Sequence, residues 1–481
     1  MNGLNLSDAS DIKLGGNTIN AIYYGSTLLW PLKRDYSKEY LTIEAVDNSI
    51  IVSFEKNSTS ISKDIQYSKD KSNWTTISFN TSENATQVEL NRGEKIYLKG
   101  NNSSYGDYPD ATQYYCNIKI IGNNSNVNLY GNIMSLLYED DFINKTTLYR
   151  DYTFWHLFRD STAIIDTSNL ILPATTLSTY CYYRMFYGCT SLTSAPELPA
   201  TTLASYCYSG MFYGCTSLTS APELPATTLA SLCYSSMFNG CTSLTSAPEL
   251  PATTLAYSCY GYMFANCEQL TVAPELPVTT LANSCYSGMF SGCTSLVNAP
   301  ELPATTLLDD CYWQMFMGCT SLTTAPELPA TTLSKSCYYL MFSGCISLTS
   351  APELPATTLA DSCYFGMLKG CTSLTTAPEL PATTLAYKCY REMFYSCDNL
   401  TTAPELPATT LLDECYREMF RKCKNINYIK CLATDISAND CTYIWTGVVA
   451  LHGTFVKNPN MTNWTKGADG IPSGWTVQDA S

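Results

Sequence analysis

Histidine, positive charge and long apolar runs are scarce in this chain of 481 residues, and each scarcity argues against a class of function. Two histidines leave little for histidine-based metal binding or acid–base catalysis. Charged residues make up only 14%, with 42 acidic against 27 basic side chains and a net charge of −15, which argues against nucleic acid or an anionic membrane as partner. The opening MNGLNLSDAS has no basic and apolar stretch, so we expect no secretory signal, and no segment approaches the length of a membrane span.

A unit of 26 residues recurs through more than half of the chain with almost no drift. From Ala221 it reads APELPATTLASLCYSSMFNGCTSLTS, and the later copies begin at Ala247, Ala273, Ala299, Ala325, Ala351, Ala377 and Ala403. A period of this length indicates a solenoid in which each coil contacts only its neighbours. Because a solenoid holds an extended surface, we expect binding rather than chemistry.

Within one coil, the pattern C-Y-x-x-M-F-x-x-C places Cys, Met and Cys at i, i+4 and i+8, with Tyr and Phe in an adjacent row. This spacing predicts one apolar face of a short helix of about two turns. Glycine directly precedes the second cysteine in many coils, as at Gly214, Gly240 and Gly292, and is typical of a helix end.

The rest of the coil, TSLTSAPEL and the residues after it, predicts a short extended segment. Leu218 and Leu224 would point inward and Thr219 outward, while Pro222 and Pro225 prevent continued ladder pairing. A strand, a turn and a helix in each coil is the plan of a leucine-rich repeat. The predicted fold class is therefore an α/β leucine-rich-repeat solenoid with 26-residue coils, preceded by small all-β modules.

Composition and pattern divide the chain into five regions. Apolar–polar alternation around glycine turns predicts an N-terminal strand module, and Asn/Ser/Gly-separated strands without a helical stripe predict a β-sandwich. LFRDSTAIIDTSNLILPATTL is a degenerate copy of the repeat, and the turn-rich tail departs from it, as capping coils do. The predicted regions, in chain order, are the strand module 1–34, the sandwich 38–125, the N-terminal cap 126–172, the solenoid 173–430 and the C-terminal cap 431–481.

The 23 cysteines include ten pairs spaced by eight residues, one pair in each coil. On a helix this spacing separates the two sulfurs by about 12 Å, which excludes a disulfide within a coil. Zinc prefers ligands that are clustered tetrahedrally, usually at closer spacing. We therefore predict buried free thiols that serve as small apolar side chains, although sulfurs of adjacent coils could approach each other.

A tyrosine follows the first cysteine in every coil, from Tyr182 to Tyr416. Such a row can bind sugars if its rings are exposed, but we expect it to pack coil against coil, with each hydroxyl reaching water or backbone.

Glutamates also recur in register, from Glu197 to Glu405. A line of like charges at the spacing of stacked strands is repulsive. Calcium bound along Glu223, Glu249 and Glu275 would relieve the repulsion, because hard cations take carboxylate oxygens. We prefer a solvated rim with hydrogen bonds to the turn, and we expect no cofactor.

No catalytic constellation stands out. Asp140 and Asp141 form an acidic pair in the segment before the repeats, and no partner for them can be nominated by spacing. We therefore expect no enzymatic activity, no catalytic residue and no metal site.

The segment CYSGMFYGCTSLT resembles the BspA-like leucine-rich repeats of gut Bacteroidales surface proteins and their phages, over residues 172–429. The inserted PELPATT and the lack of a signal peptide depart from a secreted bacterial adhesin. INAIYYGSTLLWP near the N-terminus is similar to the opening segment of tailed-phage virion proteins, and GIPSGWTV is similar to the ends of phage-encoded fibre-like proteins. These resemblances imply a virion protein, such as a tail or head fibre.

The function that we expect is a non-enzymatic virion fibre or adhesin for host attachment. Its N-terminus would bind other virion proteins, and its solenoid would bind a host surface protein or a capsular glycan. We expect a homo-oligomer, such as a trimer, located in a virion that is assembled in the host cytoplasm, without nucleic-acid binding or membrane insertion. One alternative is a bacterial cell-surface BspA-like adhesin, and a less favoured one is an enzyme that degrades capsular polysaccharide.

Two surfaces compete for the host ligand. The extended segments present a uniform lattice of threonine hydroxyls, which would suit a repeating glycan. The residues of this threonine lattice are Thr219, Thr245, Thr271, Thr323 and Thr349. The helical side varies between coils and suits a protein receptor, and its candidates are Tyr262, Trp313, Gln314, Tyr339 and Phe365. The third interpretation is that these positions vary because they are unconstrained and solvated.

Overall fold

The computed structural model describes residues 35–108, 112–122 and 125–481, together with four short strands nearer the N-terminus. Those strands pair as two antiparallel hairpins, in keeping with the strands expected there. They are β1 (Ile12–Leu14) with β2 (Asn17–Ile19), and β3 (Ile22–Tyr24) with β4 (Thr27–Trp30). The predicted attachment role of residues 1–34 otherwise falls outside the described residues.

Residues 35–134 form antiparallel sheets with alternating buried positions, as the sequence predicts for a sandwich. The first sheet runs β13 (Val127–Asn132), β5 (Leu41–Ala45), β10 (Lys95–Lys99), β7 (Asp64–Ser68) and β8 (Thr75–Ser78). The second runs β11 (Gly106–Asp107), β12 (Tyr114–Ile121), β6 (Ile50–Lys56) and β9 (Thr86–Leu90). Three short helices lie beside these sheets: η1 (Tyr36–Lys38), η2 (Ser82–Asn84) and α1 (Ser135–Tyr138).

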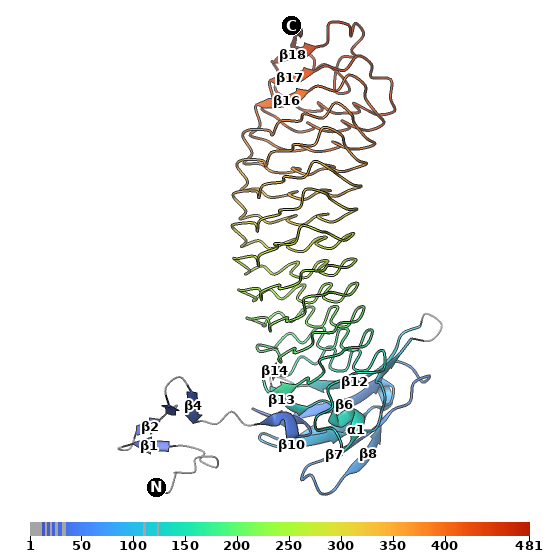
Figure 1. Ribbon diagram of the computed structural model, residues 1–481, viewed down its shortest axis with the longest axis vertical. Helices are drawn as coiled ribbons and strands as arrows, with labels where there is room; N and C mark the ends of the chain where they lie inside the picture. The colour runs from blue at the N-terminus through green and yellow to red at the C-terminus, as the bar shows by residue number, and fades with distance from the viewer. Residues whose placement is uncertain are drawn as a thin grey trace.

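The sandwich and the solenoid share strand β13. On one side β13 pairs antiparallel with β5, and on the other it pairs in parallel with β14 (Ile164–Asp166) and β15 (Leu170–Ile171). The boundary predicted between residues 125 and 126 lies just before this shared strand. Hydrogen bonds therefore continue from the sandwich into the first coils, and the solenoid rises from the sandwich as an elongated stack (Figure 1).

The predicted α/β class is wrong, because the described residues are almost entirely strands, turns and extended segments. Among them α1 is the only α-helix, and it precedes the repeats. Where a two-turn helix was expected, each coil has a run of consecutive turns, such as residues 205–214. We call this stretch the turn segment of a coil.

The hydrogen bonds explain why the turn segment is not a helix. Met211 and Tyr213 donate their N–H groups three residues back, to Tyr208 and Gly210, as in β-turns. Every second N–H donates to the next coil instead, as Phe212 does to the carbonyl of Met237 at 2.9 Å. Every fourth residue takes a left-handed conformation, which costs a non-glycine residue about 1 kcal/mol and is offset here by the bonds between coils. The glycines expected to end helices, Gly214 among them, instead occupy one of these left-handed positions.

The core consists of columns in which one residue type stacks from coil to coil. Both cysteines, the methionine and most of the Tyr–Phe pairs are almost completely buried in the repeats. Rings of the phenylalanine column stack at centroid distances of 5.5–5.9 Å and are interrupted by Leu368. Each buried side chain of this size contributes about 1.5–3 kcal/mol, so the columns dominate the solenoid's stability.

The opposite side of each coil is extended but forms few strands. Adjacent coils meet there through single bridges, such as Ser220 with Ser246, and the prolines that follow cannot donate to a ladder. A parallel sheet forms in the C-terminal coils, where three of its four strands contain no proline and only the first keeps one, Pro404. Its strands are β16 (Thr402–Leu406), β17 (Tyr428–Cys431), β18 (Thr454–Lys457) and β19 (Thr476–Asp479).

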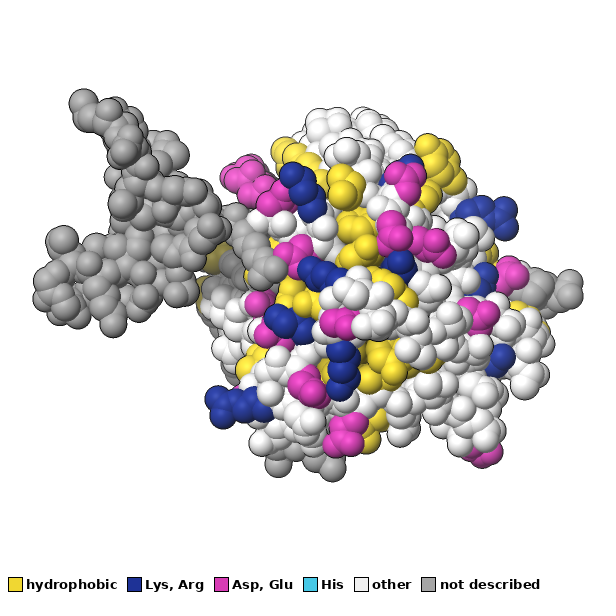
Figure 2. Space-filling model, turned by 90° about the horizontal axis from the view of Figure 1, so that it is seen from below, with side chains coloured by type: hydrophobic (Ala, Val, Ile, Leu, Met, Phe, Trp, Pro, Cys, Tyr) yellow, Lys and Arg dark blue, Asp and Glu magenta, His cyan; other side chains and the backbone are white. Residues whose placement is uncertain are grey.

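The sandwich end of the molecule carries a mixed surface. Viewed from below, Lys and Arg side chains alternate with Asp and Glu over hydrophobic patches (Figure 2). No single charge sign dominates that visible end.

Candidate binding surfaces of the solenoid

The tyrosine column is buried, as predicted for packing between coils. Its rings lie nearly parallel at centroid distances of 5.5–6.1 Å, and the first, Tyr182, is 0% exposed. The hydroxyls of Tyr182, Tyr208, Tyr234 and Tyr364 are buried and form no hydrogen bond with other described residues, so the expected contact with backbone is not made there. This column is therefore core and offers no ring to a sugar.

All 23 cysteines are buried and free, which confirms the prediction of unpaired thiols. The second cysteine of each repeat donates its S–H to a carbonyl of the preceding coil, as Cys241 does to Phe212 at 3.1 Å. Burial raises the pKa of Cys259 to about 11 and that of Cys285 to about 12. Such thiols stay protonated near neutral pH and are poor nucleophiles.

The varied aromatic residues lie on the turn segments and form one continuous strip. Trp313 stacks on Tyr339 at 5.8 Å, and Tyr339 stacks on Phe365 at 4.6 Å. Tyr262 meets Trp313 edge-on at 6.2 Å, and the guanidinium of Arg391 covers Phe365 at 5.2 Å. We call these five residues the aromatic strip.

Glycine makes room for this strip. Tyr262 and Trp313 belong to coils that are not adjacent, and Gly288 lies in the coil between them. A Cβ atom at Gly288 would lie 2.4 Å from Cε1 of Tyr262, so any larger residue would displace the ring. Gln314, the remaining sequence candidate, is half-buried and donates its backbone N–H to Tyr339 at 2.8 Å.

Stacking limits what the aromatic strip can bind. The faces of Tyr339 and Phe365 are covered by ring neighbours or by Arg391, and all of these side chains are half-buried. A sugar stacks on an open ring face, whereas a protein partner can contact ring edges and the guanidinium. The strip therefore suits a protein contact better than a glycan contact.

The predicted threonine lattice lies on the extended side and is exposed. Its residues are Thr219, Thr245, Thr271, Thr323 and Thr349. Thr245 donates its hydroxyl to the carbonyl of Thr219 at 3.3 Å, which fixes adjacent members in register. Whether a ligand contacts these hydroxyls remains a prediction.

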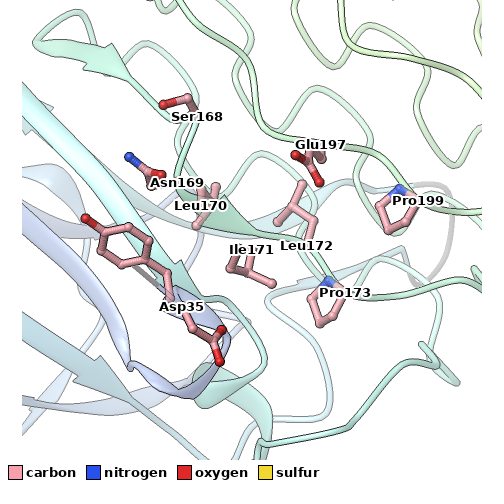
Figure 3. Close-up of a pocket in the computed structure, with 10 residues that line it drawn as sticks. Asp35, Ser168, Asn169, Leu170, Ile171, Leu172, Pro173, Glu197 and Pro199 are labelled. Carbon is pink, nitrogen blue, oxygen red and sulfur yellow. The ribbon is translucent and has the colours of Figure 1, made fainter. Parts of the chain in front are cut away.

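Beside this lattice the A-P-E-L-P segments of consecutive coils enclose a row of recesses, which we call the recess face. The recess nearest the sandwich is lined by Pro173, Glu197 and Pro199, among others (Figure 3). Further recesses repeat this lining between later coils, as with Pro222 and Glu223. Sequence reasoning missed this surface, although two prolines in every repeat were a signal that ladder pairing would fail there.

The glutamates of the recess face are exposed, as expected for a rim. From Glu223 to Glu379 no repeat glutamate has a salt bridge or a side-chain hydrogen bond with another described residue, so the expected bonds to the turn are not formed. The later Glu405 pairs with Lys430 at 2.9 Å. Within the described residues, no group of three or more His, Cys, Asp or Glu side chains is arranged to hold a metal ion, and calcium on the glutamate row stays a proposal without support here.

The acidic side chains Asp140 and Asp141 have structural partners near the sandwich. Asp140 accepts hydrogen bonds from the hydroxyl of Tyr40 at 2.6 Å and from Nζ of Lys99 at 2.9 Å, and these bonds lower the pKa of its carboxyl. Asp141 pairs with Lys145 at 2.9 Å. Burial lowers the pKa of His156 to about 2, so this side chain is neutral near neutral pH. None of these groups lies in a catalytic arrangement with another.

A stacked array of near-identical coils defines a solenoid repeat protein. Residues 163–297, 258–376 and 341–443 match the BspA type leucine-rich repeat region. Because these stretches together cover residues 163–443, more than half of the chain, the protein belongs to the BspA-type leucine-rich repeat family. Repeats of this family suggest surface adhesion or binding, and the family is not known for enzymatic activity.

No match was found among curated proteins. No helix in the described part of the chain has the length and apolar character needed to cross a membrane.

Proposed function

We propose that this protein is a non-enzymatic fibre or adhesin of a tailed-phage virion, and that its solenoid contacts the surface of the host cell. The observation that carries the proposal is the elongated array of nearly identical coils, which extends away from the sandwich (Figure 1). Such an array repeats the same exposed groups many times, and weak contacts repeated along one ligand add to a large avidity.

The resemblance of the N-terminal segment to tailed-phage virion proteins supports attachment at that end. Residues 1–34 precede the sandwich, so a particle bound there would leave the solenoid free for the host. The family assignment supports adhesion and is neutral about a phage origin.

Competition for host adsorption tests the proposal. Purified protein should reduce adsorption of the intact virions to host cells in proportion to its concentration, and antibody to residues 431–481 should label the outer ends of fibres in images of the particle. Full adsorption at saturating protein, with no label on virions, would overturn the proposal.

The same family also fits a bacterial cell-surface adhesin, which is the second candidate. Labelling of bacterial cells in the absence of phage would favour it. Release of reducing sugar from host capsule would instead favour an enzyme.

A further inference from the structure

We propose that the recess face binds an uncharged polysaccharide, whose chain lies along the row of recesses. This inference rests on the proposed function, because it names the ligand class of the host-binding solenoid. It assigns the ligand to the proline-rich segments and the threonines beside them, and leaves the aromatic strip for other contacts.

The recesses form a regular series of partly apolar sites. Those between consecutive coils have volumes of about 290–590 Å³ and the same lining of Ala, Pro, Glu, Leu and Pro. Proline and alanine offer apolar surface to the C–H groups of a sugar, and glutamate offers oxygen acceptors to its hydroxyls. A ligand that itself repeats can occupy many of these sites with the same contacts.

The backbone of the recess face forms no hydrogen bonds between coils in several of the described repeats. Residues 222–226 form no backbone hydrogen bond with a neighbouring coil, and the same holds for residues 248–252, 274–278 and 300–304 within the described chain. Proline supplies no N–H, which removes the regular ladder and leaves carbonyl and amide groups along the segment. Groups of both kinds can pair with sugar hydroxyls, which donate and accept.

Charge excludes an acidic polymer. Residues 185–334 contain nine acidic side chains and no Lys, Arg or His. The exposed carboxylates of this stretch, such as Glu249, Glu275 and Glu301, therefore meet no cation on their own face. A polysaccharide rich in carboxylate or sulfate would be repelled, whereas neutral sugar hydroxyls can donate to these oxygens.

The balance of polar groups favours a glycan over a basic peptide. In one coil, four exposed hydroxyl side chains flank the single carboxylate of Glu223, namely Thr219, Ser220, Thr227 and Thr228. Hydroxyls gain little from a cationic partner but match a ligand that is itself rich in hydroxyls. The repeated face therefore fits a neutral glycan better than a polycation.

Affinity electrophoresis of the full-length protein tests the proposal. Native gels would contain mannan, dextran, xylan or arabinogalactan as neutral polymers, and alginate or polygalacturonate as acidic ones. Poly-L-lysine binding would be measured separately by titration calorimetry. At least one neutral polymer should retard the protein, and the acidic polymers should not.

A matched pair of variants locates the site. The recess variant carries Glu249→Gln, Glu275→Gln and Glu301→Gln, which keep side-chain size but weaken each acceptor; we expect about tenfold weaker retardation by the neutral polymer. The control variant makes the same change in net charge on exposed glutamates away from the recess face. Its substitutions are Glu83→Gln, Glu89→Gln and Glu268→Gln. Unchanged thermal unfolding of both variants would show that they remain folded.

Several results would overturn the inference. These are no retardation by any neutral polymer, retardation by acidic polymers, binding of poly-L-lysine alone, or equal retardation of the recess and control variants. Adsorption competition separates this inference from the proposed function. Protein that blocks adsorption but binds no neutral polymer would refute only the ligand class, and protein that binds a neutral polymer without blocking adsorption would refute only the host-attachment role.

Discussion

The phenylalanine column gives the sharpest test of how the solenoid is held together. Phe316 is 0% exposed and stacks on Phe290 at 5.7 Å and on Phe342 at 5.6 Å. Replacing Phe316 with alanine would leave a cavity between two rings, and we expect a loss of about 3–5 kcal/mol of unfolding free energy. Leucine should cost only about 1 kcal/mol, because Leu368 fills the same column in another coil with 0% exposure.

Thermal unfolding followed by circular dichroism can measure both variants. In a domain of this size 1 kcal/mol shifts the midpoint by about 2 °C, so we expect about 6–10 °C for Phe316→Ala and about 2 °C for Phe316→Leu. The shifts are apparent values, since a repeat array need not unfold in one step. Equal midpoints for the two variants would refute the idea that the stacked column carries the stability.

Three further predictions follow from the packing. Alkylation at neutral pH should leave the cysteines of the native protein largely unmodified, and it should modify nearly all 23 after denaturation without reductant. Detection of ten disulfides would contradict the prediction that the thiols are buried and free. Replacing Trp313, Tyr339 and Phe365 with serine should reduce host adsorption if the aromatic strip binds a protein receptor. Because these rings stack on each other, the triple substitution should also lower the unfolding midpoint. Unaltered adsorption by the folded variant would exclude the aromatic strip as the receptor site. A chain beginning at Asp35 should fold but fail to join virions, and its normal incorporation would refute the attachment role of residues 1–34. This chain should also unfold at a higher temperature than one beginning at Glu39, because Asp35 caps η1.

The structure shows a contact made just before the predicted start of the sandwich at residue 38. The sequence pattern predicts the strand module at 1–34 and the sandwich at 38–125, which leaves Tyr36 outside both. In the fold, the ring of Tyr36 packs edge-on against Tyr130 of β13 at 5.1 Å. This contact spans almost a hundred residues, so no local pattern could reveal it.

The repeat period and the identity of the core columns could be read from the sequence alone. Strict recurrence of Cys, Tyr, Met and Phe every 26 residues requires that each type occupies one environment, and the structure buries nearly all of them. Apolar residues that recur at fixed spacing are driven to the interior whatever the local backbone does. The solenoid and its buried cysteines were therefore predictable.

The local backbone was decided by contacts between coils. Apolar residues at i, i+4 and i+8 fit one face of a helix. A strict period of four also fits consecutive turns in which every fourth residue is left-handed, as at Tyr206, Gly210 and Gly214. The turn segment gains hydrogen bonds to the next coil, such as Gly214 to Asn239 at 2.8 Å, which a helix would keep within itself. Since those partners lie 25 residues away, only the stacked tertiary structure selects the turns.

The candidate surfaces divide in the same way. Sequence variation singled out Trp313, Tyr339 and Phe365, and the threonine lattice was visible as a repeated residue type. Only the stacking of coils showed that the aromatic rings cover one another's faces. The recess face likewise arises because prolines of successive coils align and cannot form a ladder, which is a property of neighbouring coils together and of no single repeat.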